Sequence, residues 1–219
     1  MDYQGPTAED LRNIRALNGA FLRATNSGDG PLDNGIASRP LTEMQIRRLS
    51  EAPFLLFSFR EQDAEFWKRV IADDPQEDLL QAAPPPTERI HELQVAGLGF
   101  LWQLSRRNPY VARLACGAPA KWCESIARLT LVSLIRRAAG RGDLTLPRFD
   151  AEDHVGQRLL QSGSSARPQL QCMSQQFALQ AMLTCGSALQ YEELPAAACR
   201  FPGTAQRVAD RDTKKGRKV

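Results

Sequence analysis

The residues of this 219-residue chain that could do metal or nucleophilic chemistry are its five cysteines and two histidines. Structural zinc sites usually take their ligands from close pairs, such as two cysteines separated by two residues. The closest pair here, Cys116 and Cys123, is seven residues apart, and we expect a helix to start between them. His91 and His154 lie far apart in the sequence. We therefore expect no metal site and no cofactor.

A nucleophilic site would need a cysteine or serine, a histidine base and a third group that orients the base. Cys123 lies two residues after Lys121 near an expected helix start, an arrangement that can lower the pKa of a thiol. No surrounding motif marks Cys123, and the chain has neither the Gly-x-Ser-x-Gly pattern nor a phosphate-binding loop. An enzyme whose site forms only in three dimensions is one hypothesis.

Basic side chains are the other candidate functional group, because they are unevenly distributed. Residues 1–85 carry a net charge of −5 and residues 86–219 a net charge of +8. Such asymmetry can reflect a nucleic-acid or acidic protein partner. A short basic tail is more often only a solvated terminus, and arginines at a helix end can serve only to complement the helix dipole. The candidate contacts are Arg136, Arg137 and Arg141 at an expected helix end, and Arg207, Arg211, Lys214, Lys215, Arg217 and Lys218 in the tail.

The stretch 88–140 is the expected centre of the fold. Apolar residues recur at spacings of three and four through Glu88–Arg107, and further apolar residues fill most of its circumference. The uncharged run Leu93–Ser105 has thirteen residues, fewer than the roughly 20 that a membrane-spanning helix needs. We therefore predict a buried helix and no membrane span. A second long helix is predicted from Pro119 to about Ala139.

Local signals predict where several helices begin and end. Thr7 and Thr42 each precede a pattern typical of a helix start, and Thr42-Glu-Met-Gln45 matches a capping box. Asn108-Pro109 ends the first central helix and begins a short one that Gly117 ends. Gly97 lies inside the first central helix, where glycine costs about 1 kcal/mol relative to alanine. Either a helix crosses close to Gly97 or a ligand needs the room.

Two apolar segments have an ambiguous or extended pattern. Phe54–Phe59 is continuously apolar and fits either a buried strand or a helix. We favour a helix, because the sequence shows no second strand for it to pair with. Leu144–Phe149 is predicted to be extended because it contains a proline. Pro168 opens the last long helix, which runs to about Cys185 with Leu170, Met173, Phe177, Ala181 and Met182 on its apolar face.

Together these elements predict an all-α fold, a single irregular bundle of about seven to nine helices around the central apolar helix pair. Prolines 84–86 separate an acidic helical subdomain, residues 1–83 with a mobile loop at 26–40, from a helical core, residues 84–203. Residues 204–219 form a basic tail with almost nothing apolar to bury, and we predict that this tail is disordered.

Composition narrows the function. The chain has no basic stretch followed by an apolar stretch at its start and an odd number of cysteines, so we expect a cytoplasmic protein with free thiols. Mainly by elimination, we predict a non-catalytic helical protein that acts through protein–protein contacts, as an adaptor, a regulator or a self-associating subunit. The first alternative is a nucleic-acid-binding transcriptional regulator that uses basic residues of the C-terminal part.

Overall fold

The computed structural model of the chain describes residues 5–26, 40–72, 86–149 and 153–191, the last seven of them by backbone alone. The predicted mobile loop falls almost entirely on residues outside this set, and the predicted disordered tail falls wholly outside it. The chain has two compact units, Met1–Gly186 and Ser187–Val219. Only residues 187–191 of the second unit are described, as the end of a helix.

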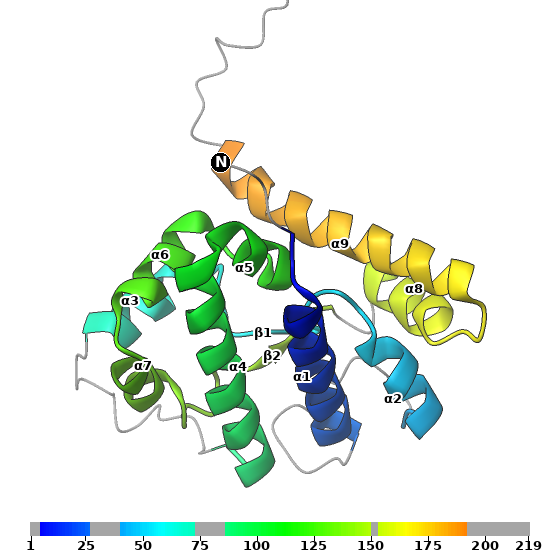
Figure 1. Cartoon of the computed structure of the whole chain (residues 1–219), viewed down its shortest axis with the longest axis horizontal. Helices are drawn as coiled ribbons and strands as arrows, with labels where there is room; N and C mark the ends of the chain where they lie inside the picture. The colour runs from blue at the N-terminus through cyan, green and yellow to red at the C-terminus, as the bar shows by residue number, and fades with distance from the viewer. Residues whose placement is uncertain (1–4, 27–39, 73–85, 150–152, 192–219) are drawn as a thin grey trace, which may run out of the picture. The chain divides into compact units, whose positions relative to one another are not determined.

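About 72% of the described residues are helical, which confirms the all-α prediction (Figure 1). The nine helices of the described residues are α1 (Ala8–Asn26), α2 (Glu43–Ser50), α3 (Ala64–Ala72), α4 (Glu88–Arg107), α5 (Pro109–Cys116), α6 (Ala120–Arg128), α7 (Leu131–Ala138), α8 (His154–Gly163) and α9 (Pro168–Tyr191). A short antiparallel pair of strands, β1 (Phe57–Ser58) and β2 (Leu146–Pro147), lies among the helices. The division of the chain at residue 83 stays a prediction.

Helix α4 is the central element of the first unit, because it packs against α1, α5, α6 and α7. Its buried residues form one broad face that includes Leu98 and Leu101. Trp102, on the edge of that face, is only partly buried. The predicted buried helix therefore forms, and its broad buried side meets four other helices.

The predicted caps form as expected. The Thr42 hydroxyl accepts a hydrogen bond from the Gln45 amide, and the Gln45 side chain accepts one from the Thr42 amide. At the start of α5, Asn108 Oδ1 accepts from the Val111 amide at 3.2 Å. Gly117 ends that helix in the left-handed conformation, with φ of 64°, which glycine adopts without strain.

The prediction of a continuous helix from Pro119 to Ala139 is wrong. Leu129 is extended between α6 and α7, and the Thr130 hydroxyl caps α7 by accepting from the Ser133 amide at 3.1 Å. The indole N–H of Trp102 donates to the Leu129 carbonyl at 2.8 Å. The break is stable because the indole satisfies a carbonyl near the end of α6, where the helix itself supplies no donor.

The prediction of a helix over Phe54–Phe59 is also wrong, because none of these residues is helical and Phe57–Ser58 form strand β1. We call Phe54–Phe59 the extended segment. Its own strand β1 pairs with β2 over only two residues, so most of its backbone groups need other partners. Side chains from distant elements supply them. Asn18, which is completely buried in α1, donates to the Phe54 carbonyl at 2.9 Å and accepts from the Leu56 amide at 2.9 Å. The indole of Trp67 donates to the Phe59 carbonyl.

The extended segment also explains Gly97. A Cβ atom at this position would lie 2.6 Å from Cζ of Phe59, so an alanine would collide with the ring. One interpretation of Gly97 predicts a helix that crosses close to it. The close neighbour is instead an aromatic ring of the extended segment. The ring of Phe57 packs edge-on against Phe59, with centroids 5.2 Å apart, and lies tilted against Phe21 of α1, with centroids 5.1 Å apart. These rings form the middle of the core.

Candidate interaction surface

The three arginine candidates outside the tail differ in their exposure and in their contacts. Arg136 is exposed on α7. Arg137 is half-buried and donates from Nη1 to the carbonyl of Ile71. The guanidinium of Arg141 lies 5.5 Å from the centre of the Phe66 ring. Arg137 and Arg141 thus take part in contacts within the fold, so the three arginines do not form one open basic patch. The six basic candidates of the tail lie outside the described residues.

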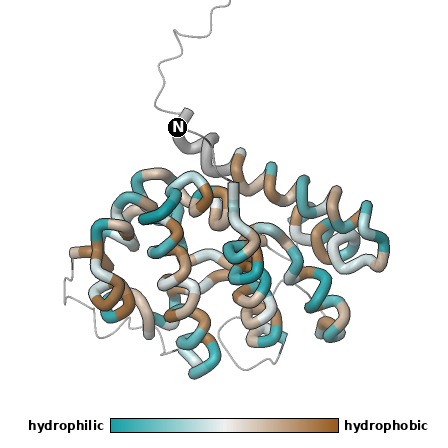
Figure 2. The backbone as a smooth tube through the Cα atoms, viewed as in Figure 1, coloured by the Kyte–Doolittle hydropathy of each residue, from teal (hydrophilic) through white to brown (hydrophobic). Residues whose placement is uncertain are grey.

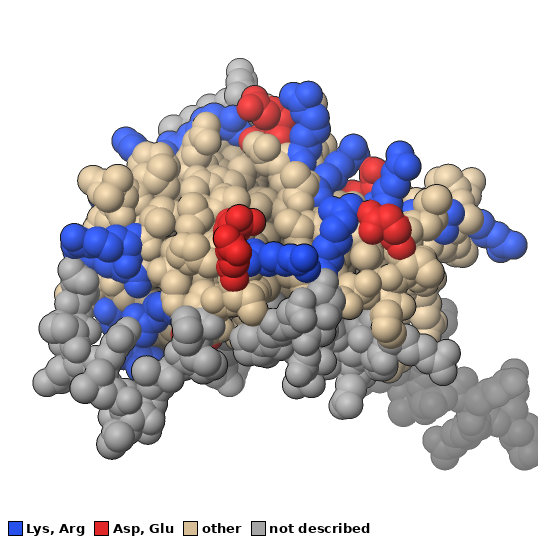
Figure 3. Space-filling model, turned by 90° about the horizontal axis from the view of Figure 1, so that it is seen from below, with Lys and Arg blue, Asp and Glu red and all other residues tan. Residues whose placement is uncertain are grey.

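The charged surface itself is mixed. On the face drawn in Figure 3, Lys and Arg side chains lie next to Asp and Glu side chains and are separated by wide uncharged areas. Several of the charges pair with each other, as Arg23 does with Glu43 at 2.6 Å and Arg15 with Glu51 at 3.2 Å. Such alternation gives less support to a nucleic-acid interface than a continuous basic stripe would.

The two buried cysteines are not activated nucleophiles. Burial raises the pKa of Cys123 to about 11, although a hydrogen bond with Ser105 opposes this in part. Burial and the nearby Glu61 carboxylate also raise the pKa of Cys116. The expectation that Lys121 and a helix start lower the pKa of Cys123 is wrong, because the loss of solvent dominates. Among the described residues, no three His, Cys, Asp or Glu side chains are placed to hold a metal ion.

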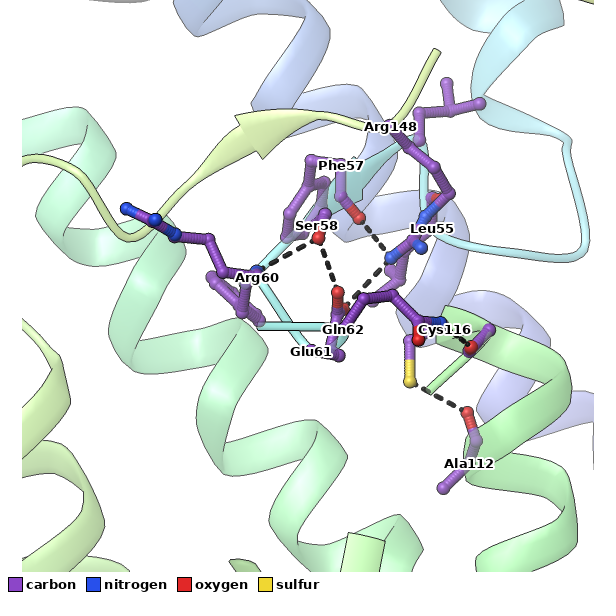
Figure 4. A network of polar contacts seen from close by, with 12 residues as sticks. Leu55, Phe57, Ser58, Arg60, Glu61, Gln62, Ala112, Cys116 and Arg148 are labelled. Atoms are coloured by element: carbon purple, nitrogen blue, oxygen red, sulfur yellow. Dashed lines mark hydrogen bonds and ion pairs between the residues drawn. The ribbon is translucent and has the colours of Figure 1, made fainter. Parts of the chain in front are cut away.

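A buried polar network joins the extended segment and Glu61 to Arg148, which directly follows β2 (Figure 4). We call it the polar joint and define it as Ser58, Glu61 and Arg148, with the carbonyls of Leu55 and Phe57. Arg148 donates to those two carbonyls at 2.9 and 2.7 Å and pairs with Glu61 at 3.0 Å. The Ser58 hydroxyl donates to the other oxygen of the Glu61 carboxylate at 2.5 Å.

The polar joint is closed to solvent. The side chains of Arg148 and Glu61 are 8% and 0% exposed. A Cβ atom at Gly117 would lie 2.7 Å from Cγ of Met182 and 3.6 Å from Nη1 of Arg148, so these three residues meet. Because the ion pair is enclosed and its atoms are hydrogen-bonded within the protein, the polar joint fits a structural role. Sequence analysis missed it, although an apolar run without a partner strand does signal that its backbone needs donors from elsewhere.

A groove with a volume of about 540 Å³ lies between α1, α2 and α4. Its floor is aliphatic, with Leu17, Ala20 and Leu93 among the lining residues, and Arg89 and Glu92 lie on its α4 side. Basic and acidic side chains both line the groove, so its charge selects neither anions nor cations.

Helix α9 differs from the rest of the chain because it has no charged side chain. It is 24 residues long, and at the chain average of 24% charged residues a segment of this length would contain about six. Figure 2 shows hydrophilic and hydrophobic residues alternating along it, and the hydrophilic ones are mostly glutamines. A surface without charge over this length is typical of the inner part of a protein–protein interface.

The buried side of α9 is only partly the predicted one, because Met182 is buried and Phe177 and Ala181 pack against the core. Ser174, Ala178 and Met182, four residues apart, are buried, whereas Leu170 and Met173 are 38% and 55% exposed. We define the α9 outer face by its exposed residues Leu170, Cys172, Met173, Gln176 and Gln180.

Aromatic and small residues of neighbouring elements hold the inner side of α9. Phe177 lies 4.7 Å below the guanidinium of Arg158 and 6.0 Å from the ring of His154, both on α8. Ser174 packs close to Gly163 at the end of α8. Because these contacts fix the rotation of α9, Met173 and Cys172 stay turned away from the core.

Comparison with known proteins finds no family model, no curated protein and no solved structure that matches this chain. In the described part of the chain, no helix combines the length and apolar character that crossing a membrane requires.

Proposed function

We propose that this is a non-catalytic helical protein that acts through protein–protein contacts, and that its first partner is a second copy of the same chain. The observation that carries the proposal is the α9 outer face, on which exposed Met173 and Leu170 lie in a helix without any charge. Methionine and uncharged surface are both enriched in the inner part of protein interfaces. A uniform, uncharged face also suits self-association.

In a two-fold dimer the same patch contacts itself, so any charge near the axis would meet its own copy. Helix α9 has no such charge, so residues of α9 that meet their own copies across the axis would bring no like charges together. The glutamine amides Gln176 and Gln180 can each donate and accept hydrogen bonds, so they can pair with their own copies.

We place the protein in the cytoplasm as part of this proposal. Cys116, Cys123 and Cys172 are free thiols, which suits a reducing compartment. Exposed Cys172 lies on the α9 outer face, where an oxidising environment would cross-link it readily. Fractionation of cells that express the tagged protein tests the placement, and recovery in a secreted fraction would contradict it.

The dimer is tested by sedimentation velocity over a range of concentrations with the wild type and Met173→Glu. We expect the wild type to dimerise as concentration rises and Met173→Glu to stay monomeric, because the variant places two carboxylates together. Met44→Glu is the matched control, since Met44 on α2 is 54% exposed and Met173 is 55% exposed. A monomeric wild type at the highest soluble concentration, or equal effects of the two variants, would refute the proposal.

Nucleic-acid binding is the second hypothesis, and the described residues favour it less. Their Lys and Arg outnumber Asp and Glu by twenty to twelve, but Arg137 and Arg141 are engaged within the fold. Titration with a DNA duplex at two salt concentrations separates the hypotheses. Binding to DNA should weaken steeply with salt because counterions compete, whereas dimerisation through an uncharged face should not.

A further inference from the structure

A second exposed apolar site lies where α6 gives way to α7. Val132 is 77% exposed, the most exposed of the large hydrophobic residues in the described part of the chain, and its neighbour Leu131 is 37% exposed. Both belong to the first turn of α7. Apolar residues placed singly on a surface are ordinary. This pair therefore marks a binding site only if the residues around it also fit a ligand.

Helix α4 supplies the other side of the same site. Gly99 leaves open space toward Leu131, because a Cβ atom there would have Cδ1 of Leu131, at 3.9 Å, as its nearest neighbour. Trp102, one turn further along α4, is half-buried and holds the α6–α7 break through its bond to Leu129. Trp102 and the two exposed aliphatic residues therefore lie where α4 meets the start of α7, linked by the Trp102–Leu129 hydrogen bond and by the approach of Leu131 to Gly99.

One arginine contacts this surface, and a second lies next to Leu129 in the sequence. The guanidinium of Arg106 lies 4.8 Å above the Trp102 ring, which holds it in place. Arg128, the last residue of α6, precedes Leu129 and is exposed. No ion pair joins either arginine to an acidic side chain among the residues that the structure describes. The site thus combines an apolar centre with two positive charges that have no acidic partner there.

We propose that this surface, the α4–α7 patch (Gly99, Trp102, Arg106, Arg128, Leu131 and Val132), binds an acidic segment of a partner protein in which Asp or Glu flank an aliphatic side chain. Charge complementarity selects the partner, because both flanking groups are cationic. The apolar centre selects a segment with an aliphatic residue, which would contact Val132 and Leu131. The inference goes beyond the proposed dimer, since it concerns another surface and another class of partner.

Two other occupants fit the patch less well. The α9 outer face of a second copy has no acidic residue to meet Arg106 and Arg128. Nucleic acid would present phosphates to the arginines, but it would leave exposed Val132 and Leu131 without an apolar partner. Phosphate recognition relies on basic and hydrogen-bonding groups, so the apolar centre favours a protein segment.

The test uses fluorescence anisotropy with the full-length protein and a short labelled peptide in which glutamates flank a pair of leucines. We expect saturable binding that weakens about tenfold in Val132→Ser. The substitution removes the apolar methyl groups that the bound peptide would cover. Arg106→Gln and Arg128→Gln should each weaken binding about threefold to tenfold at low salt and less at high salt. Met44→Ser and Arg12→Gln, which change exposed residues elsewhere, should bind the peptide like the wild type.

Two further probes make each outcome decisive. A peptide with glutamines in place of the glutamates, and one with serines in place of the leucines, should both bind more weakly than the first. An equal loss of peptide affinity in Val132→Ser and Met44→Ser, or no binding of the acidic peptide to the wild type, would overturn the proposal. Binding of a DNA duplex but not of the peptide would overturn it in favour of nucleic acid. Loss of dimerisation in Met173→Glu leaves this measurement unaffected, so the two proposals fail separately.

Discussion

The polar joint and α9 use polar side chains in opposite ways. The joint buries a glutamate completely and an arginine almost completely, and hydrogen bonds satisfy both side chains. Helix α9 carries no charge at all and leaves Met173 and Leu170 exposed. Since a buried charge without its partner is very costly and an exposed neutral residue is not, we expect the joint to control stability and the α9 outer face to control association.

Arg148→Met should have the largest effect on stability. The substitution leaves the buried Glu61 carboxylate without its counterion and removes the donors to the Leu55 and Phe57 carbonyls. We expect a loss of about 3–5 kcal/mol in the free energy of unfolding, measured by urea denaturation. Arg12→Met, at an exposed position, should change it by less than about 0.5 kcal/mol. A loss below about 1 kcal/mol in Arg148→Met would show that the joint is dispensable.

Gly97→Ala tests the packing beside the joint. The new methyl group would lie 2.6 Å from the ring of Phe59, and forcing the ring aside should cost more than the roughly 1 kcal/mol that alanine gains in a helix. We expect a net loss of about 1–2 kcal/mol by thermal or urea unfolding. Gly99→Ala is the matched control in the same helix. Its methyl group would meet only Leu131, at 3.9 Å, so the same measurement should show a gain.

The ion pair of Asp10 with Arg107 is intermediate between the buried polar joint and an exposed surface. The Asp10 carboxylate is buried, whereas Arg107 is half-exposed. Burial raises the pKa of Asp10, but hydrogen bonds from Arg107 and Thr7 outweigh burial and hold the pKa below its ordinary value of 3.8. The ionised form therefore stabilises the fold above about pH 4, and this contribution disappears as the pH falls through the lowered pKa.

Asp10→Asn should accordingly cost about 1 kcal/mol at neutral pH, as the loss of a helix cap does. The difference between variant and wild type should shrink as the pH falls below about 4. Thermal midpoints of both proteins across this range provide the measurement. A difference that is independent of pH would show that the charge of Asp10 contributes nothing.

Met173→Gln should have the smallest effect on stability. The side chain is exposed and glutamine is a good helix former, so we expect a change of less than about 0.5 kcal/mol. Met182→Gln makes the comparison within α9, because Met182 is buried against Gly117 and the polar amide should cost about 1–3 kcal/mol there. Equal thermal midpoints for the two variants would show that α9 is not packed through its inner side.

The parts of the fold that depend on neighbouring residues could be predicted from the sequence. The capping box at Thr42 and the left-handed Gly117 need only a few residues on either side. The break at Leu129 and the extended conformation at Phe54–Phe59 were not predicted, because they depend on distant donors. Trp102 is 27 residues from Leu129. No pattern in the sequence links such pairs.

The candidate surfaces were missed for a related reason. Periodicity identified α9 as amphipathic but placed Met173 inward, because the helix has apolar residues on more than one side. Its inner side includes the small buried residues Ser174, which lies against Gly163 of α8, and Ala178, and neither has a strong hydrophobic signal of its own. The α4–α7 patch exists only because the helix breaks at Leu129, and it could not be predicted before that break was known.

Asn18 has a consequence for the order in which the chain folds. Its side chain bonds backbone groups 36 and 38 residues away, and Arg148 bonds the same segment from 91 and 93 residues away. The backbone of the extended segment therefore gains these hydrogen-bond partners only when α1 and the residue that follows β2 have packed against it. Loops of this length close slowly. We infer that this segment is ordered in the last, cooperative step of folding, and that its amides at Leu55 and Leu56 exchange with solvent only when the first unit unfolds as a whole.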